Sequence, residues 1–348
     1  MFELNNILRE NIKNLTPYSS ARDEYTGEAS VFLDANENAY GSPLETAYNR
    51  YPDPLQYQVK LKLSQIKGVP PRNIFLGNGS DEAIDILFRS FCNPGVDNVI
   101  IVPPTYGMYQ VSANINDVEA KKVLLNDEYQ LDLEGIAEAI DKNTKLIFIC
   151  SPNNPTGNSI NRDDIETLLA NFNGIVVIDE AYINFSRQKT FIQELTEYAN
   201  LVVLQTLSKA WGLAGLRVGM AFASEEIIEV MNKVKPPYNV NEASQQLALQ
   251  ALNNVSLVNL WIKETLEQRD SLVLALKEFD FVLDIYPSDA NFILVKTTDA
   301  KTIYDFLVQH GIIIRDRSKV ELCEGCLRIT IGTPDENKTL LSTLQQYK

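Results

Sequence analysis

The chain has 348 residues, of which 45% are hydrophobic and 22% charged, and its formal net charge is −15. These values are ordinary for a folded globular enzyme, and they exclude a disordered chain and a small binding module. Because the chain is acidic and has no block of Lys and Arg, nucleic acid is a poor partner, and affinity for an anion has to come from one local pocket.

The composition and the order of residues also indicate the compartment of the protein and limit the side chains that could catalyse its reaction. No apolar run approaches the ~20 residues that span a bilayer. The first residues lack the apolar centre of a signal peptide, so we expect a cytoplasmic protein without a membrane segment. Cys323 and Cys326 form one isolated Cys-x-x-Cys pair, which we interpret as reduced thiols and not as a metal site. With His310 as the only histidine, another side chain has to carry protons.

Hydrophobic periodicity predicts alternating helices and strands from residue 80 onward. One helix is predicted to begin at Ser80 and another after Asn161, because apolar residues then recur at helical spacing. The segments between the apolar runs are long enough for crossovers, so we predict an α/β fold with a mostly parallel, doubly wound sheet. The predicted buried strands cover residues 98–102, 145–150, 175–178 and 201–204.

A different pattern follows the Pro236-Pro237 break. Helical spacing predicts a long helical stretch over roughly residues 243–279, and shorter strands follow at 291–295 and 326–331. We interpret this part as a smaller α+β domain. The predicted organisation is an N-terminal arm (1–30), a large domain (31–236) and a small C-terminal domain (237–348).

Three polar residues follow predicted strands at the edge where open α/β sheets collect their ligands. Asn154, Asp179 and Lys209 each lie at or just beyond the carboxyl end of a strand. Taken singly, an Asp at this place is usually a helix cap, and a loop Lys is usually solvated. The combination of the three residues favours a ligand site.

The segments around these residues resemble the signature segments of fold-type I aminotransferases. The matching stretches run from Ser151 to Gly157, from Asp179 to Tyr182 and from Ser208 to Gly219, in the same order and at similar spacing. The resemblance implies pyridoxal 5′-phosphate as cofactor. It also implies that Lys209 binds the cofactor aldehyde as an imine and moves the substrate proton, while Asp179 keeps the pyridine nitrogen protonated.

The same resemblance implies the residues that surround the cofactor ring and phosphate. Asn154 and Tyr182 match donors to the ring phenolate, and Tyr106 matches the aromatic residue that stacks on the ring. The glycine-rich turn before the predicted helix at Ser80 would present backbone N–H groups to the phosphate. The residues expected at the phosphate are Gly79, Ser80, Asp81, Ser208 and Arg217.

Nearly the whole chain resembles the histidinol-phosphate aminotransferase subfamily, through segments that begin at Asn14, Leu33, Arg50, Leu76, Ile313 and Cys326. The resemblance implies a homodimer in which Tyr51 reaches the cofactor phosphate of the neighbouring subunit. It also implies a substrate pocket for histidinol phosphate and for glutamate or 2-oxoglutarate, because arginine forks suit both phosphate and carboxylate. The matching pocket residues are Tyr18, Asn36, Arg315 and Arg328.

One departure and several alternatives accompany this interpretation. Ala39 stands where family members often have proline, which makes that loop less rigid. Aromatic aminotransferases share many of these segments, and so do decarboxylases of phosphorylated amino acids. A transcription regulator with an aminotransferase-like module would need a basic DNA-binding segment, which the roughly 35 residues before the first motif do not supply.

Overall fold

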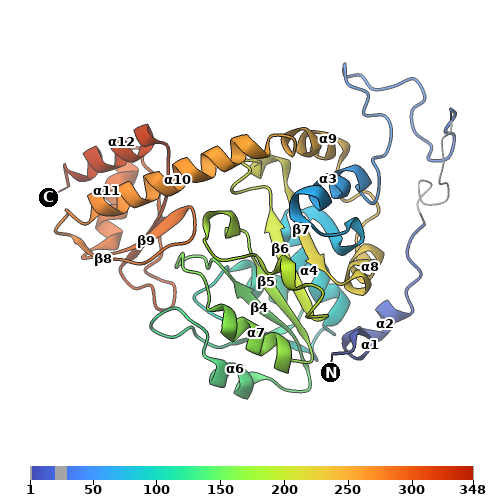
Figure 1. Ribbon diagram of the computed structural model, residues 1–348, viewed down its shortest axis with the longest axis horizontal. Coiled ribbons are helices and arrows are strands. Elements are labelled where there is room, and N and C mark those ends of the chain that lie inside the picture. Colours follow the sequence, from blue (N-terminus) through green and yellow to red (C-terminus); the bar gives the residue numbers. More distant parts are fainter. Residues whose placement is uncertain (1, 20–29, 348) are drawn as a thin grey trace.

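The computed structural model describes residues 2–19 and 30–347 of the chain. A seven-stranded sheet forms the centre of its larger part (Figure 1), in the order β1-β7-β6-β5-β4-β2-β3. All neighbouring strands are parallel except those of β7, which runs antiparallel to β6 and β1. The predicted α/β fold with a mostly parallel sheet is therefore confirmed. The strands are β1 (Ile74–Asn78), β2 (Asn98–Ile101), β3 (Glu119–Lys122), β4 (Thr144–Cys150), β5 (Ile175–Asp179), β6 (Leu201–Thr206) and β7 (Val218–Ala223).

Helices cover both faces of this sheet, which explains why its central strands are uninterrupted apolar runs. Along β4, Leu146 and Phe148 belong to one buried cluster, while Ile147 and Ile149 belong to the cluster on the opposite face. The first cluster includes side chains of α4 (Ser80–Phe91), α5 (Met108–Ile115) and α8 (Glu225–Val234), and the second includes those of α3 (Tyr57–Lys67), α6 (Leu133–Ala139), α7 (Arg162–Asn171) and α9 (Glu242–Ala251).

A smaller unit is built on a four-stranded antiparallel sheet with the order β10-β11-β9-β8. Its core joins the sheet to two helices and to the end of a third. The predicted strands at 291–295 and 326–331 are present with shifted ends. The elements are α10 (Val255–Leu276), β8 (Val282–Ile285), β9 (Phe292–Thr297), α11 (Ala300–Gln309), β10 (Arg315–Asp316), β11 (Cys326–Thr330) and α12 (Pro334–Leu344).

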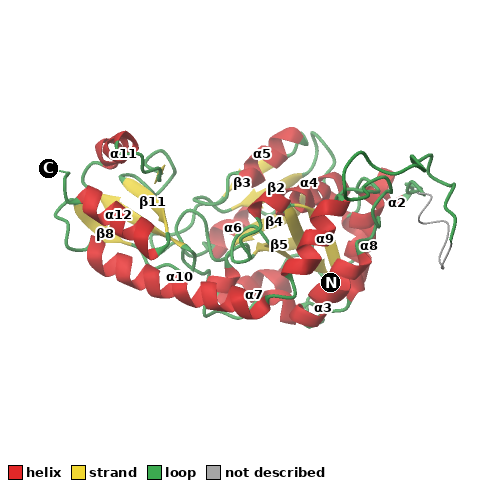
Figure 2. Ribbon diagram, turned by 90° about the horizontal axis from the view of Figure 1, so that it is seen from above, coloured by secondary structure: helices red, strands yellow, loops and turns green. Residues whose placement is uncertain are grey.

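The helical stretch predicted over residues 243–279 is present, but it is divided into two helices, α9 and α10. The side chains of Asn253 and Asn254 donate hydrogen bonds to the carbonyls of Leu249 and Gln250. Such local bonds offer the backbone an alternative to continued helix, and the chain changes direction here. From this point α10 runs along both units (Figure 2) and connects their two cores.

The N-terminal segment begins with the short helices α1 (Leu4–Ile7) and α2 (Glu10–Lys13). Ile7 and Ile12 are buried in the same cluster as residues of α8, so this end of the chain is fixed to the large unit. Residues 20–29 of the predicted N-terminal arm lie outside the described residues. The chain from residue 30 to 50 then extends away from the body (Figure 1), and Val31, Leu33 and Tyr40 are exposed on it.

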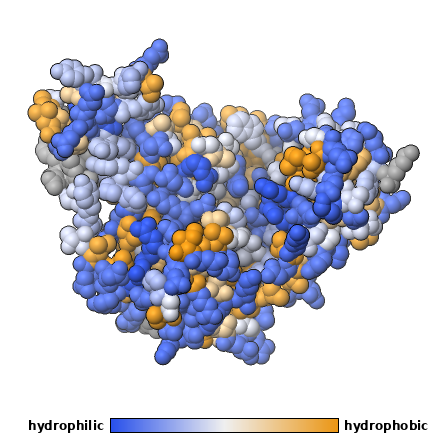
Figure 3. Space-filling model, turned by 180° about the vertical axis from the view of Figure 1, so that it is seen from behind, coloured by the Kyte–Doolittle hydropathy of each residue, from blue (hydrophilic) through white to orange (hydrophobic). Residues whose placement is uncertain are grey.

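The surface seen from behind is mainly hydrophilic, with hydrophobic residues in scattered groups (Figure 3). Among the described residues, no helix is long and apolar enough to cross a bilayer. Cys92, Cys150, Cys323 and Cys326 are all buried and unpaired. His310 caps the end of α11, and its Nδ1 atom lies 2.8 Å from the carbonyl oxygen of Phe306.

Candidate active site

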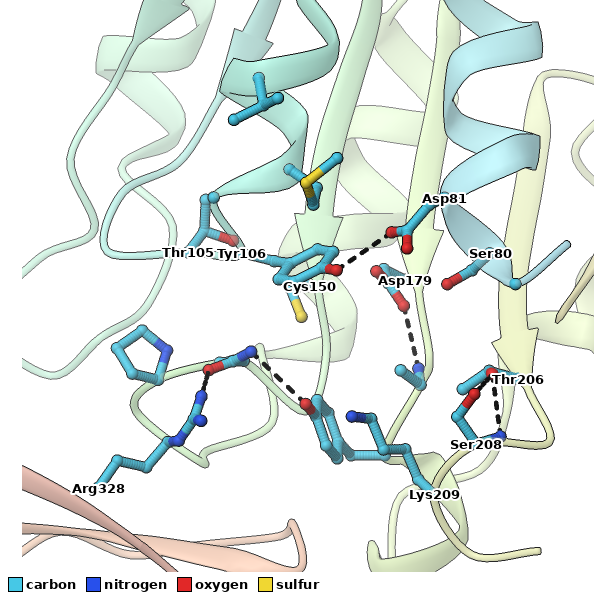
Figure 4. A pocket seen from close by; sticks show the side chains of 18 of the residues that line it. Ser80, Asp81, Thr105, Tyr106, Cys150, Asp179, Thr206, Ser208, Lys209 and Arg328 are labelled. Atoms are coloured by element: carbon cyan, nitrogen blue, oxygen red, sulfur yellow. Dashed lines mark hydrogen bonds between the residues drawn. The ribbon is translucent and has the colours of Figure 1, made fainter. Parts of the chain in front are cut away.

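A cavity of about 550 Å³ opens where β4, β5 and β6 end, between the large sheet and the small one. The close-up in Figure 4 shows Asp179, Lys209 and Tyr106 gathered around it. This is the edge of the sheet at which the sequence predicted a ligand site. The predicted residues that line the cavity are Gly79, Ser80, Asp81, Tyr106, Asn154, Asp179, Tyr182, Ser208, Lys209, Arg217, Arg315 and Arg328.

Lys209 presents a primary amine to this cavity from the loop that follows β6. The amine lies 5.4 Å from the centre of the Tyr182 ring. Within the described part of the chain, this amine makes no hydrogen bond and no ion pair. Desolvation, followed by the positive charge of Arg328, lowers the pKa of Lys209 below its usual value. Lys209 is therefore both accessible and easier to deprotonate than an ordinary surface lysine, as a nucleophilic amine must be.

Asp179 ends β5 and is only 3% exposed. Its Oδ2 atom accepts a 2.8 Å hydrogen bond from the hydroxyl of Tyr109, and its Oδ1 atom accepts one of 3.1 Å from the backbone N–H of Ala181. Burial raises the pKa of Asp179 to about 6, and the two donors counteract part of that effect. The arrangement leaves a desolvated carboxylate that a cationic ligand group would stabilise.

Tyr109, which the sequence analysis did not single out, contacts this carboxylate through its hydroxyl group. It lies on α5, is fully buried, and stacks on Phe148 with ring centres 4.9 Å apart. Tyr106 meets it edge to face at 5.6 Å, and the Tyr106 hydroxyl donates a 3.1 Å hydrogen bond to Asp81. Only the helical spacing of Tyr106 and Tyr109 in the sequence could have suggested that both contribute to one site.

A second polar cluster surrounds the N-terminus of α4. Gly79 has φ +75° and precedes the helix, and the guanidinium of Arg217 lies 2.7 Å from the place where a Cβ at Gly79 would stand. A Cβ on Gly219 of β7 would lie 2.1 Å from the nitrogen of Ser80, so the two segments approach as only glycine allows. The Thr206 and Ser208 hydroxyls, 2.9 Å apart, complete the cluster. Backbone N–H groups, hydroxyls and a guanidinium at a helix start form a site suited to a phosphate.

Asn154, Tyr182 and Arg328 connect the large unit to the small sheet. The side-chain N–H of Asn154 lies 3.5 Å from the Tyr182 hydroxyl, and its Oδ1 atom accepts a hydrogen bond from Arg328. Arg328 also lies 5.2 Å from the centre of the Phe292 ring. Burial raises the pKa of Tyr182, so its hydroxyl stays protonated and can donate.

Three predicted residues lie away from this cavity. Asn36 and Tyr51 line a separate pocket of about 540 Å³, where Tyr51 stacks on Tyr238 with ring centres 4.5 Å apart. Tyr18 is 74% exposed on the N-terminal segment. None of these three side chains lines the cavity that holds Lys209.

Comparison with known proteins gives the class to which this fold and site belong. The family described as "Aminotransferase class I and II" matches residues 31–344, so the chain belongs to the class I and II aminotransferases. Histidinol-phosphate aminotransferase of Cytophaga hutchinsonii is 57% identical over 346 residues, which cover 99% of both chains. That of Parabacteroides distasonis is 55% identical over 348 residues, covering 100% of both. Within its class, the chain therefore belongs to the histidinol-phosphate aminotransferase family.

A solved structure supports the fold. Histidinol-phosphate aminotransferase of Sinorhizobium meliloti, in complex with pyridoxal-5′-phosphate, superposes with a TM-score of 0.80. The match covers 90% of this chain and 89% of the other at 23% sequence identity. The cofactor of the class I and II aminotransferases is pyridoxal 5′-phosphate. The desolvated Asp179 carboxylate, the exposed Lys209 amine and the helix-start phosphate site, all on one cavity, fit this cofactor.

Proposed function

We propose that this protein transfers the amino group of histidinol phosphate to 2-oxoglutarate, giving imidazole-acetol phosphate and glutamate, in histidine biosynthesis. The names of its full-length relatives support the substrate. The observation that carries the reaction is the placement of Lys209 and Asp179 on one cavity, with arginines opposite them. An amine, a carboxylate and arginine forks are the groups that amino transfer between anionic substrates needs.

The bound cofactor supplies an aldehyde for the amino group and a protonated ring that accepts electrons from the substrate carbon. Asp179 would accept a hydrogen bond from the ring nitrogen and keep it protonated. Asn154 and Tyr182 would donate to the ring oxygen, and Tyr106 would cover one ring face. Because the ring would be fixed by several side chains, its plane is set before the substrate enters.

The cofactor phosphate would bind at the start of α4. Gly79, Ser80 and Asp81 would present backbone N–H groups there, and Ser208 and Arg217 would add a hydroxyl and a guanidinium. Arg217 also lies 3.5 Å from the Asp81 carboxylate, which orients its fork.

Proton transfer falls to Lys209. Its Nζ atom would take the proton from the substrate carbon that carries the nitrogen. The lowered pKa of Lys209 makes it a better base near neutral pH than a solvated lysine. Arg315 and Arg328 would bind the phosphate or carboxylate of the substrate, with Tyr18 and Asn36 closing the pocket.

We also propose a homodimer in the cytoplasm. Tyr51 is half-exposed and lies outside the cavity of its own subunit, as a residue that serves a neighbouring subunit has to. The four unpaired cysteines suit a reducing compartment.

An absorbance titration tests this proposal. Wild-type protein with added pyridoxal phosphate should show the visible band of the lysine-bound cofactor, and histidinol phosphate should bleach it. Lys209→Ala should not complete that change, while Lys263→Ala, at an exposed lysine on α10, should behave as wild type. Bleaching by phenylalanine but not by histidinol phosphate would favour an aromatic aminotransferase. Release of carbon dioxide without consumption of an oxo acid would identify a decarboxylase.

A further inference from the structure

Arg317, a residue with no assigned role, lines the same cavity as Arg315 and Arg328. In the small sheet, Arg315 of β10 pairs directly with Arg328 of β11. The backbone N–H of Arg317 donates a 2.9 Å hydrogen bond to the carbonyl of Cys326, so the ladder continues past the end of β10. Because alternate residues of a strand share a face, Arg317 lies on the same face as Arg315.

In the described part of the chain, no carboxylate forms an ion pair with any of these three arginines, although the charge of Asp316 acts on Arg317 from a greater distance. Among residues 2–19 and 30–347, none of the three guanidinium groups has an acidic side chain within 4.0 Å. Two of the acidic residues near them in sequence have partners of their own: Asp316 accepts a hydrogen bond from the backbone N–H of Ser318, and Glu321 forms an ion pair with Lys122. The cavity thus concentrates positive charge in a protein whose net charge is −15.

This concentration of charge opposes folding unless an anion binds. Like charges directly opposite in a sheet are destabilising. Desolvation and the neighbouring Arg315 lower the pKa of Arg317, and desolvation and Arg317 lower that of Arg328. Each guanidinium therefore lies in the field of another. A carboxylate carries one charge and is matched by one arginine fork, whereas a phosphate monoester carries close to two charges and three terminal oxygens near neutral pH.

We propose that Arg317 is a specificity-determining residue that binds the phosphate group of the substrate and selects phosphate monoesters over amino acids without phosphate. The inference rests on the proposed function and deepens it. Arg315 and Arg328 serve both substrates of the reaction. Arg317 engages only the larger, more highly charged one, so it contributes to binding of histidinol phosphate and little to binding of glutamate.

Steady-state kinetics of three variants test this role. Arg317→Gln removes the charge and keeps a hydrogen-bonding side chain, and Arg317→Lys keeps the charge without the fork. Lys319→Gln, at an exposed lysine two residues further on that does not line the cavity, is the matched control. For Arg317→Gln, kcat/KM for histidinol phosphate should fall by about 10- to 100-fold, mainly through KM. For the same variant, kcat/KM for histidinol, which lacks the phosphate, and kcat/KM for glutamate should each change by less than about threefold.

Further outcomes complete the test. Arg317→Lys should recover part of the loss, and the inhibition constant for inorganic phosphate should rise in Arg317→Gln but not in Lys319→Gln. An equal loss for histidinol and histidinol phosphate, or no loss for either, overturns the inference while leaving the proposed function intact. If the wild-type protein does not use histidinol phosphate, the proposed function fails. In that case, an inhibition constant for phosphate that is unchanged in Arg317→Gln overturns the inference as well. A raised constant supports the role of Arg317 in binding the phosphate of a different phosphate monoester.

Discussion

The hydroxyl group of Tyr109 donates a 2.8 Å hydrogen bond to the Oδ2 atom of Asp179. Since burial raises the pKa of Asp179 to about 6, this donor helps to keep the carboxylate charged at neutral pH. Tyr109→Phe should therefore raise the pKa of Asp179 further. The acidic limb of the pH profile of kcat/KM should shift upward by about one unit. Tyr57→Phe, at an exposed tyrosine of α3, is the control, and an unshifted limb would show that Tyr109 only fills space.

The buried charge of Asp179, which cofactor binding would need, should lower the stability of the cofactor-free protein. Its pKa in the folded protein is raised from 3.8 to about 6, so the folded state binds a proton more tightly than the unfolded state. Without cofactor, stability consequently falls as pH rises between these two values and stays low above them. Asp179→Asn should stabilise the cofactor-free protein at pH 7 by about 3 kcal/mol, with a smaller gain at pH 5.

Denaturant unfolding at the two pH values measures this gain. Because the variant lacks the charge that would hold the ring nitrogen, added pyridoxal phosphate should stabilise it less than wild type. A variant that is destabilised at both pH values would contradict the electrostatic explanation.

The phosphate site requires a residue without a side chain at position 219. A Cβ at this position would lie 2.1 Å from the backbone nitrogen of Ser80, so the start of α4 would have to move. Gly219→Ala should weaken cofactor binding by at least about tenfold, by displacing the N–H groups that face the phosphate. Equilibrium dialysis with pyridoxal phosphate measures this. Gly215→Ala, where a Cβ meets nothing within 4 Å, should bind as wild type.

The proposed role of Tyr51 across the dimer can be tested by mixing variants. Tyr51→Ala and Lys209→Ala should each lose most of their activity as homodimers. If Tyr51 serves the neighbouring subunit, a mixed dimer contains one site with both residues intact, and unfolding and refolding the two variants together should restore activity. If Tyr51 serves its own subunit, no site in the mixed dimer is complete. Tyr40→Ala, at a fully exposed tyrosine, controls for the loss of an aromatic side chain.

The sequence predicted the central strands well because they are buried on both faces. The runs at 145–150 and 175–178 correspond to β4 and β5 within a residue at each end. The edge strand β3 and the strand β7 did not emerge from the pattern. β3 consists of Glu-Ala-Lys-Lys and is partly exposed, and β7 is interrupted by Gly219 and by small residues that allow close packing. In both strands, contacts with the rest of the fold determine the structure more than the local pattern of apolar residues does.

The sequence also predicted part of the candidate site, and it missed two residues of it. Motif positions brought Asp179, Lys209 and Arg217 to one cavity, since the strand ends that hold them meet at one edge of the sheet. Tyr109 and Arg317 were missed because each is defined by a contact across the fold. A tyrosine on a buried helical face resembles an ordinary core residue, and an arginine in a loop is ordinarily solvated.

The two ends of the cavity belong to separate bodies: Lys209 follows a strand of the large sheet, and the arginines stand on the small one. If the substrate binds at both ends, as proposed, it acts as a temporary cross-link in addition to the permanent one that α10 provides. Each turnover would then form and break that cross-link. On this proposal the two units are connected most firmly while substrate is bound, and the small sheet is held least firmly between product release and the next binding event.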